Sequence, residues 1–435
     1  MAIPPPVIGL IGIGVLLCIM LSRMPIAFVF ALTGFLGFAY NVKLNAAFHL
    51  LAVDFFDTLS SYNLTVIPLF ILMGQLAYHG GISQKLYTAG YSLFGRTRGG
   101  LAMGTIAACA GFAACCGSSP ATSATMGSVA LPEMRRHGYA DTLATGCLAA
   151  GGTLGILIPP SVILIIYGIM VEESIGKLFL AGVLPGIFLA ILYIIAIYIF
   201  TLINPNAGPA GSRTSFKQKV LALIRGGGET LAIFVLIIGG LFIGFFTPSE
   251  AGAIGAVGVL LIGLVERELK WQGILSACYD TIKLSSMILL IISGAAVFGH
   301  FLASTTLPFV VAGWVTGLPF QRTYIMLLII LGYIVGGTAM DAMALLLLTL
   351  PIFFPVVVAL GYDPIWFGVI SVEMMEIAAI TPPVGLNVYV IKGVAGVPLE
   401  TIFKGILPFF VADVVSVVVL LFVPQLALVL PNLMG

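Results

Sequence analysis

Most of this chain consists of apolar runs that are long enough to cross a lipid bilayer as helices. A helical span needs roughly 20 mostly apolar residues. Runs close to that length lie at 7–22, 25–41, 63–79, 140–171, 179–203, 229–246, 248–266, 280–302, 364–392 and 405–430. Only 8% of the 435 residues are charged, whereas soluble domains carry roughly 25%. We therefore predict an all-α polytopic membrane protein whose surroundings are a lipid bilayer.

The rest of the composition excludes several other classes of protein. The formal net charge is only +1 and no basic tail or patch occurs, so we predict no nucleic-acid partner. None of the six cysteines has CxxC or Cys/His ligand spacing, which argues against a disulfide framework and against a zinc site. The first apolar run lacks a basic leader and an A-x-A cleavage site, so we expect it to be retained as the first helix.

Two apolar stretches, 100–132 (hairpin 1) and 323–355 (hairpin 2), are too long for one crossing and carry small or polar residues at their centres. The first contains "AACCGSSPATSATMGS" and the second contains "VGGTAMDAMA". A chain that enters the membrane halfway, turns on small residues and returns has this pattern. Such backbone is tolerated only where protein or water covers it. We predict two re-entrant helical hairpins.

A proline pair interrupts the apolar helix that follows each hairpin. "GTLGILIPPSV" (152–162) contains the first pair, and "AITPPVGLNV" (379–388) contains the second. Proline has no amide donor and clashes with the carbonyl one turn earlier, so each pair frees backbone carbonyls. A proline pair can also be a simple kink, but the recurrence favours two broken helices, 140–171 and 364–392. We call the proline positions break 1 and break 2.

The second half of the chain repeats the first at an offset of 223 positions. Pro159-Pro160 then aligns with Pro382-Pro383, and Gly138-Tyr139 aligns with Gly361-Tyr362. Basic residues flank hairpin 1 on both sides, whereas hairpin 2 has only Arg322 before it. Under the positive-inside rule, hairpin 1 enters from the cytoplasm and hairpin 2 from the opposite face. Inverted repeats with broken helices are typical of secondary transporters, whose site lies at the repeat interface.

These features divide the chain into five predicted segments. They are N-terminal scaffold helices (1–62), repeat 1 with hairpin 1 and its broken helix (63–203), a cytoplasmic loop (204–228), further scaffold helices (229–279), and repeat 2 with hairpin 2 and its broken helix (280–435).

The polar residues at the tips and breaks predict where ligands bind. Freed carbonyls and hydroxyl groups form a hard-oxygen cage that suits Na⁺, and the half-helix after each break presents amide groups to an anion. The hydroxyl candidates are Ser118, Ser119, Thr122, Thr153, Thr338 and Thr381. The alternative for all of these hydroxyls is helix packing.

The intramembrane acids are also candidates, each with a structural alternative. Asp341 is predicted to coordinate a cation or gate it, against a salt bridge or a hairpin cap. Glu376, one turn before Thr381, is predicted to assist the second site or to bond the backbone, and Glu373 is a similar but weaker candidate. Glu250 in "TPSEAGA" is as well explained by a helix cap as by function.

Several long motifs closely resemble one family over nearly the whole chain. They are "GSSPATSATMGSVALPEM", "GGTLGILIPPSVILIIYG", "LFLAGVLPG", "TPSEAGA" and "ITPPVGLNVYV". The chain resembles the large membrane subunit (M subunit, DctM type) of tripartite ATP-independent periplasmic (TRAP) transporters. The resemblance implies an inverted-repeat ion-transporter fold with a scaffold and a mobile domain that moves as an elevator.

The resemblance also implies Na⁺-driven import of an organic acid, such as a C4-dicarboxylate or a sialic acid, across the bacterial inner membrane. It implies two partners, a small four-helix Q subunit (DctQ type) and a periplasmic substrate-binding P subunit (DctP type). The implied Na⁺ ligands are Ser118, Ser119, Thr153 and Gly155 at site 1, and Gly337, Asp341, Thr381 and Pro383 at site 2. The predicted substrate contacts are Thr122, Pro160 and Asn387.

Three other functions compete with this interpretation. A stand-alone Na⁺/carboxylate symporter would have a similar architecture without a binding protein. An intramembrane hydrolase would use Asp341 or Ser118, but neither hairpin contains a histidine base, and Glu376 would have to be the second acid. A scaffold-only assembly subunit would not need two polar breaks. We therefore predict a transporter and not an enzyme.

Overall fold

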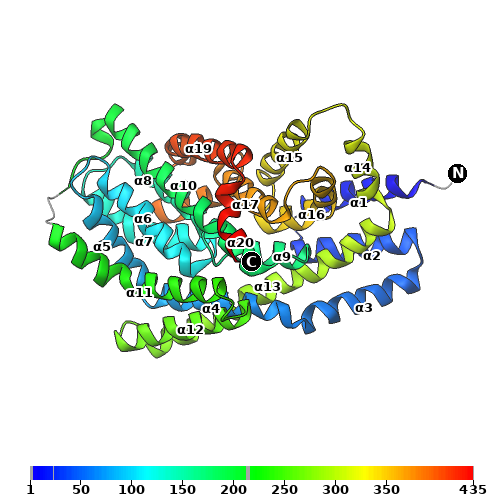
Figure 1. Cartoon of the computed structure of the whole chain (residues 1–435), viewed down its shortest axis with the longest axis horizontal. Helices are drawn as coiled ribbons and strands as arrows, with labels where there is room; N and C mark the ends of the chain where they lie inside the picture. The colour runs from blue at the N-terminus through cyan, green and yellow to red at the C-terminus, as the bar shows by residue number, and fades with distance from the viewer. Residues whose placement is uncertain (1–2, 23, 212–215, 435) are drawn as a thin grey trace. The chain divides into compact units, whose positions relative to one another are not determined.

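The computed structural model describes residues 3–22, 24–211 and 216–434, and this part of the chain is helical with no strand (Figure 1). The first ten α-helices are α1 (Pro5–Met20), α2 (Ile26–Asn41), α3 (Leu44–Ser60), α4 (Val66–His79), α5 (Ile82–Phe94), α6 (Gly100–Cys116), α7 (Ser119–Arg136), α8 (Asp141–Leu157), α9 (Val162–Met170) and α10 (Ile175–Ile203). The others are α11 (Phe216–Phe242), α12 (Pro248–Val265), α13 (Trp271–Ser304), α14 (Leu307–Thr316), α15 (Arg322–Gly337), α16 (Ala342–Ala359), α17 (Pro364–Ile380), α18 (Leu386–Ala395), α19 (Leu399–Phe422) and α20 (Gln425–Leu433).

The helix lengths agree with a polytopic membrane protein. Within the described residues, six helices are long and apolar enough to cross a membrane, and a bent pair formed by Leu44–Ser60 and Tyr62–His79 raises the number to seven. One of the six, Asp141–Met170, contains break 1. The predicted spans at 7–22 and 25–41 are the shorter apolar helices α1 and α2, of 16 residues each. The predicted all-α polytopic fold class is confirmed.

Helix α3 has no counterpart among the predicted spans. His49, Asp54 and Asp57 interrupt its apolar pattern. The structure buries the Asp54 side chain and places its Oδ2 2.9 Å from Nδ1 of His300 on α13. A carboxyl with a partner inside the protein is tolerated in an apolar helix. The segment therefore forms one continuous helix although polar residues interrupt its apolar pattern.

The segment predicted as a loop to residue 228 is helical from Phe216 onward, as the first part of α11. The hydrophilic segment 204–220 was the basis for this loop, and Gly226, within the predicted loop, has a packing reason. A Cβ on Gly226 would lie 2.6 Å from the Lys85 carbonyl oxygen, so glycine lets α11 approach α5 closely. Arg213, which the loop was predicted to contain, lies outside the described residues.

The helix bounds repeat at the offset that the prolines predicted. A shift of 223 positions carries α7 (119–136) onto 342–359 and α8 (141–157) onto 364–380, which are the bounds of α16 and α17. Both proline pairs, Pro159-Pro160 and Pro382-Pro383, contain a cis peptide bond. Secondary structure thus repeats along with sequence, while the opposite orientation of the repeats stays a prediction.

The chain divides into two compact units. The first contains 1–65, 282–332 and 342–367, and the second contains 66–281, 333–341 and 368–435. In the first unit, Asn41 on α2 donates from Nδ2 to the carbonyl and hydroxyl oxygens of Ser304 at 3.1 and 3.0 Å. The second unit holds the tips of both hairpins and both breaks, so it carries the candidate site.

Helix α8 lies among the other helices of the second unit and carries the first half of break 1. It contacts α6, α7, α10, α18 and α19. Figure 1 shows α6 and α7 beside α5 and α8. Glycine permits the closest of these crossings, because a Cβ on Gly146 would collide with the Gly405 backbone of α19. The interior around break 1 is therefore tightly packed.

Candidate functional site

The tip of hairpin 1 is a turn of two residues, Gly117 and Ser118. Helix α6 ends at Cys116, and Gly117 follows in the left-handed conformation, with φ +64°. Glycine adopts this conformation without a Cβ clash and so commonly ends helices. Ser118 is extended, and α7 begins at Ser119 with Pro120 in its first turn, where a missing amide costs nothing. The turn was predicted from these residue types.

Break 1 separates two half-helices inside the protein. Helix α8 ends at Leu157 and α9 begins at Val162, with the proline pair between them, and every residue from 151 to 168 is buried. Ser161 caps α9, because its Oγ accepts a hydrogen bond from the Leu164 amide at 3.3 Å. The helix predicted to be broken is therefore broken at the proline pair.

The tip of hairpin 1 packs directly against break 1. The Pro160 carbonyl oxygen lies 2.7 Å from where a Cβ of Gly117 would be. A Cβ on Gly155 would lie 2.6 Å from Oγ1 of Thr122 and 2.7 Å from the Ser118 carbonyl oxygen. The Thr122 hydroxyl donates to that carbonyl at 2.8 Å. The structure thus brings together Ser118, Thr122 and Gly155, with Pro160 against the same turn.

The oxygens at this contact are of the kind that Na⁺ prefers. Ser118 and Pro160 contribute backbone carbonyls, and Thr122 contributes a hydroxyl, all of them hard neutral ligands. The described residues contain no group of three or more His, Cys, Asp or Glu side chains arranged to hold a metal ion. The donor set therefore fits an alkali cation better than a transition metal.

Asn387 ties the second repeat to hairpin 1. Its Nδ2 donates to Oγ of Ser119 at 2.7 Å and to the Ala149 carbonyl of α8 at 3.1 Å. The side chain is fully buried, and its Oδ1 has no hydrogen-bond partner within the described residues. Asn387 was predicted to contact substrate, and the structure places it at the start of α18, directly after break 2.

The Thr153 hydroxyl faces a different polar group. It donates to the Ala150 carbonyl at 2.6 Å and lies 3.1 Å from the hydroxyl of Tyr193 on α10. Tyr193 in turn donates to Oδ1 of Asp413 on α19. Thr153, predicted as a Na⁺ ligand, is thus linked to a buried acid that the sequence predictions did not include.

That acid belongs to a buried acid cluster, which we define as Glu373 and Glu376 on α17 together with Asp413. All three side chains are 0% exposed, and their charges are close enough to interact. Glu376 also lies beside the backbone of Leu157 at break 1; it was predicted either to assist the second site or to bond the backbone, and this position agrees with the second alternative. A lone acid in the apolar run 405–430 is a functional signal, so Asp413 was detectable from sequence, whereas Tyr193 was not.

The site 2 residues only partly match site 1 at the offset of 223: Asp341 aligns with Ser118, whereas Gly337 and Thr381 align with Ala114 and Ile158. Gly337 ends α15 and is buried, while Asp341 follows the tip and is exposed, although the sequence placed it deep in an apolar hairpin. Thr381 bonds back to the Ile377 carbonyl of its own helix. Pro383 is exposed, unlike the prolines of break 1. Site 2 stays a prediction.

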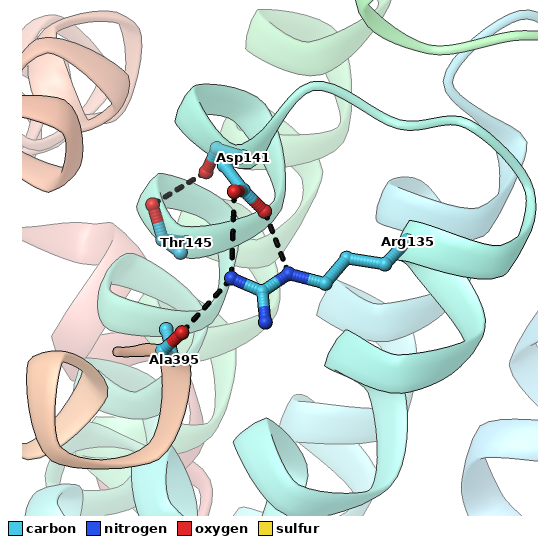
Figure 2. A network of polar contacts seen from close by, with 4 residues as sticks. All are labelled: Arg135, Asp141, Thr145 and Ala395. Carbon is cyan, nitrogen blue, oxygen red and sulfur yellow. Dashed lines mark hydrogen bonds and ion pairs between the residues drawn. The ribbon is translucent and has the colours of Figure 1, made fainter. Parts of the chain in front are cut away.

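Arg135 joins the far ends of three elements (Figure 2). Its guanidinium lies 2.8 Å from Oδ1 and 3.4 Å from Oδ2 of Asp141 at the start of α8. Its Nη2 also donates to the Ala395 carbonyl at the end of α18 at 2.9 Å. Thr145 donates to the Asp141 carbonyl at 2.6 Å. The end of hairpin 1, the start of α8 and the end of α18 are thus held together.

Glu250 has a structural role in helix α12. Its carboxylate accepts from the Thr247 amide at 2.8 Å, and its own amide donates to Oγ1 of Thr247 at 3.3 Å. This reciprocal pair is a capping box, which satisfies two amides at the helix start. The cap alternative for Glu250 is confirmed.

Comparison with known proteins identifies the family. The family model described as "Tripartite ATP-independent periplasmic transporter, DctM component" matches residues 13–426. The chain is 38% identical over 386 residues to the C4-dicarboxylate TRAP transporter large permease protein DctM of Pseudomonas aeruginosa, covering 88% of this chain and 90% of that protein. It is 32% identical to the sialic acid TRAP transporter large permease protein SiaM of Vibrio cholerae, covering 95% and 96%.

Two further similarities concern architecture. The isethionate TRAP transporter permease protein DctMQ of Oleidesulfovibrio alaskensis is 32% identical over 85% of this chain, which spans 58% of that longer protein. The solved structure of the Alcanivorax borkumensis YdaH transporter has a TM-score of 0.61 at 15% identity, covering 87% of this chain and 88% of that one, so the two share a fold. The chain therefore belongs to the DctM family, the large permease component of TRAP transporters, and is a multi-pass protein of the bacterial inner membrane.

Proposed function

We propose that this chain couples Na⁺ entry to the import of an organic acid that a periplasmic binding protein delivers. The observation that carries the proposal is the packing of the hairpin 1 tip against break 1. Carbonyl and hydroxyl oxygens of Ser118, Thr122 and Pro160 lie at this contact, and Gly117 and Gly155 leave no side chain in the way. Oxygens fixed by a helix break can replace the hydration shell of a cation.

The transported anion is best accounted for by the half-helices that follow the breaks. Helices α9 and α18 begin shortly after a proline pair, and the first amides of a helix have no partner within the helix itself. Such an end carries a partial positive charge and favours a carboxylate. The relatives named for C4-dicarboxylates and for sialic acid both take carboxylates, so we infer that the substrate of this chain is a carboxylate.

Two partners follow from the family. The family name describes a tripartite system, and the DctMQ relative extends well beyond the region that this chain matches. We infer that a small Q-type membrane subunit and a P-type binding protein act with this chain. Both tips and both breaks lie in the second unit, and we infer that they belong to the part that moves in an elevator-type cycle, whereas 229–279 of the same unit are predicted to be scaffold.

Reconstitution in liposomes tests the proposal. The chain is combined with a small membrane subunit and a binding protein, and uptake of labelled succinate or of a labelled sialic acid is measured with and without an inward Na⁺ gradient. We expect uptake only when all three components and the gradient are present. Uptake by this chain without the binding protein would establish the stand-alone symporter instead. Equal uptake with and without the Na⁺ gradient would overturn the coupling.

A further inference from the structure

The buried acid cluster lies in an environment that does not suit three free charges. Glu373, Glu376 and Asp413 are each 0% exposed within apolar helices. Among the described residues, no lysine, arginine or histidine forms an ion pair with any of them. A buried charge is expensive unless it is paired or bound to a cation. The cluster therefore requires a positively charged ligand or a proton.

Most oxygens of the cluster are available for such a ligand. Neither oxygen of Glu373 or Glu376 has a hydrogen-bond partner within the described residues, and the same is true of Oδ2 of Asp413. Ser416, on α19 and also 0% exposed, lies beside the Glu373 carboxyl. Buried carboxyl oxygens without partners have unused bonding capacity, which a bound proton would fill.

The arrangement favours a proton over a metal ion. The described His, Cys, Asp and Glu side chains form no group of three arranged to hold a metal. A protonated carboxyl is neutral and gains an O–H donor for a neighbouring oxygen. Tyr193 on α10 faces the cluster and bonds Asp413, while Tyr167 on α9 contacts Gly368, which lies on α17 five positions before Glu373.

The cluster is also connected to the contact between hairpin 1 and break 1. The Asp413 carboxylate accepts from Tyr193, whose hydroxyl meets Thr153 two residues before Gly155. Glu376 lies beside Leu157, the last residue of α8. A change in the charge of the cluster therefore acts on break 1 across a short distance in a low-dielectric interior, where Coulomb interactions are strong.

We propose that Glu373, Glu376 and Asp413 form a proton-binding site whose occupancy is coupled to Na⁺ binding at the hairpin 1 tip. The coupling, though not the proton site itself, rests on the proposed function. Loss of the proton adds negative charge near break 1, so Na⁺ binds more tightly when the cluster is deprotonated. By linkage, Na⁺ binding releases protons to the same extent.

Infrared spectroscopy of the purified chain in lipid nanodiscs tests the proton site without any transport. A protonated carboxyl has a carbonyl stretch apart from the carboxylate bands. We expect such a band in the wild type, lost as pH is raised, and removed in part by Glu373→Gln, Glu376→Gln or Asp413→Asn. The matched control is Glu400→Gln, an exposed acid on α19 that pairs with Lys404. The band is compared in those of the three variants that remain monodisperse. If none of these variants changes the band, the proton site is overturned.

The coupling is tested by thermal unfolding in increasing Na⁺. The quantity measured is the Na⁺ concentration that gives half of the maximal rise in unfolding temperature. It is measured at one pH below and one pH above the pH at which the infrared band is lost. In the wild type we expect this concentration to fall about tenfold at the higher pH, within the usual range of coupling between sites. In Glu376→Gln, which lacks the acid beside Leu157, the change with pH should be smaller, because only Glu373 and Asp413 can still lose a proton. If Na⁺ stabilises the wild type equally at both pH values, the coupling is overturned but the proton site is not. No stabilisation by Na⁺ at either pH contradicts the proposed function, and the infrared result then still decides the proton site.

Discussion

At the scale of single residues, two glycines decide how closely hairpin 1 approaches break 1. Gly117 has a positive φ and lies against Pro160, and Gly155 lies against Ser118 and Thr122. The atoms that a Cβ on Gly155 would meet include a backbone oxygen, which cannot rotate away as a flexible side chain can. This position therefore tests whether the contact matters for ion binding.

We expect Gly155→Ala to weaken Na⁺ activation of uptake. The new methyl group must displace the Ser118 carbonyl or the Thr122 hydroxyl, so the Na⁺ concentration for half-maximal uptake should rise by about tenfold, equivalent to ~1.4 kcal/mol. Gly239→Ala on α11 is the control, because a Cβ there has nothing within 4 Å. Equal Na⁺ curves for both variants would show that the hairpin 1 contact does not hold the ion.

Asn387 gives a prediction about stability. Asn387→Ala leaves the Ser119 hydroxyl and the Ala149 carbonyl without their buried donor, which typically costs about 1–3 kcal/mol. Thermal unfolding of the purified chain should therefore shift to lower temperature. Tyr389→Phe, on the exposed face of the same helix, should not shift it. A stable Asn387→Ala protein with impaired uptake would instead favour the predicted substrate contact.

At this scale the sequence predicted residue types better than partners. Ser118 and Thr122 were predicted from the small and polar residues at the hairpin tip, Gly155 was implied by the family resemblance, and the structure brings the three together. Tyr193 and Asp413 lie 220 positions apart in the chain, and no local pattern signals that they bond. Pairing of this kind depends on how whole helices pack, which a single sequence does not contain.

At the scale of elements, the proline pairs predicted the breaks because their effect is local. Each pair removes backbone amide donors whatever tertiary contacts the segment makes. The limits of α8 and α9 follow from that chemistry, together with the cap at Ser161. The limits of α3 and α11 do not follow from local patterns, because their polar residues and glycines are explained by contacts with α13 and α5. Tertiary packing overrides the local signal there.

The Arg135 contact gives a prediction for an element. Arg135→Ala removes the donor to the Ala395 carbonyl and the pair with Asp141. Because these side chains are partly exposed, global stability should fall by less than about 1 kcal/mol. Hydrogen exchange should nevertheless quicken in α18, whose C-terminus loses its anchor.

The neighbouring Arg136→Ala is a matched control for this experiment. Arg136 is more exposed and pairs only with Glu133 of its own helix in the described structure. Its removal should leave exchange in α18 unchanged. If both variants exchange alike, Arg135 does not hold α18 in place, and the contact in Figure 2 has no mechanical role.

At the scale of the whole molecule, the repeat predicts two ion sites, each at a hairpin tip and the break that follows it. The bounds of α7 and α8 recur as α16 and α17 at the same offset as the proline pairs. The surroundings differ, however: the prolines of break 1 are buried, whereas those of break 2 are exposed. Sequence symmetry therefore predicts corresponding positions without predicting equal environments.

Substitution at both tips tests whether the two repeats share the work of Na⁺ coupling. Ser118→Ala removes the hydroxyl predicted as a Na⁺ ligand at the tip of hairpin 1 and leaves the Ser118 carbonyl in place. Asp341→Ala, just after the tip of hairpin 2, should have a larger effect because it removes a full charge. We expect each variant to shift the Na⁺ activation curve of uptake to higher concentration while the complex with the small subunit still assembles. If the two residues belong to separate ion sites, the double variant should lose more of the Na⁺ dependence of uptake than either single variant does. Na⁺ curves that match the wild type in both single variants, with assembled complexes, would place the ions away from the hairpin tips.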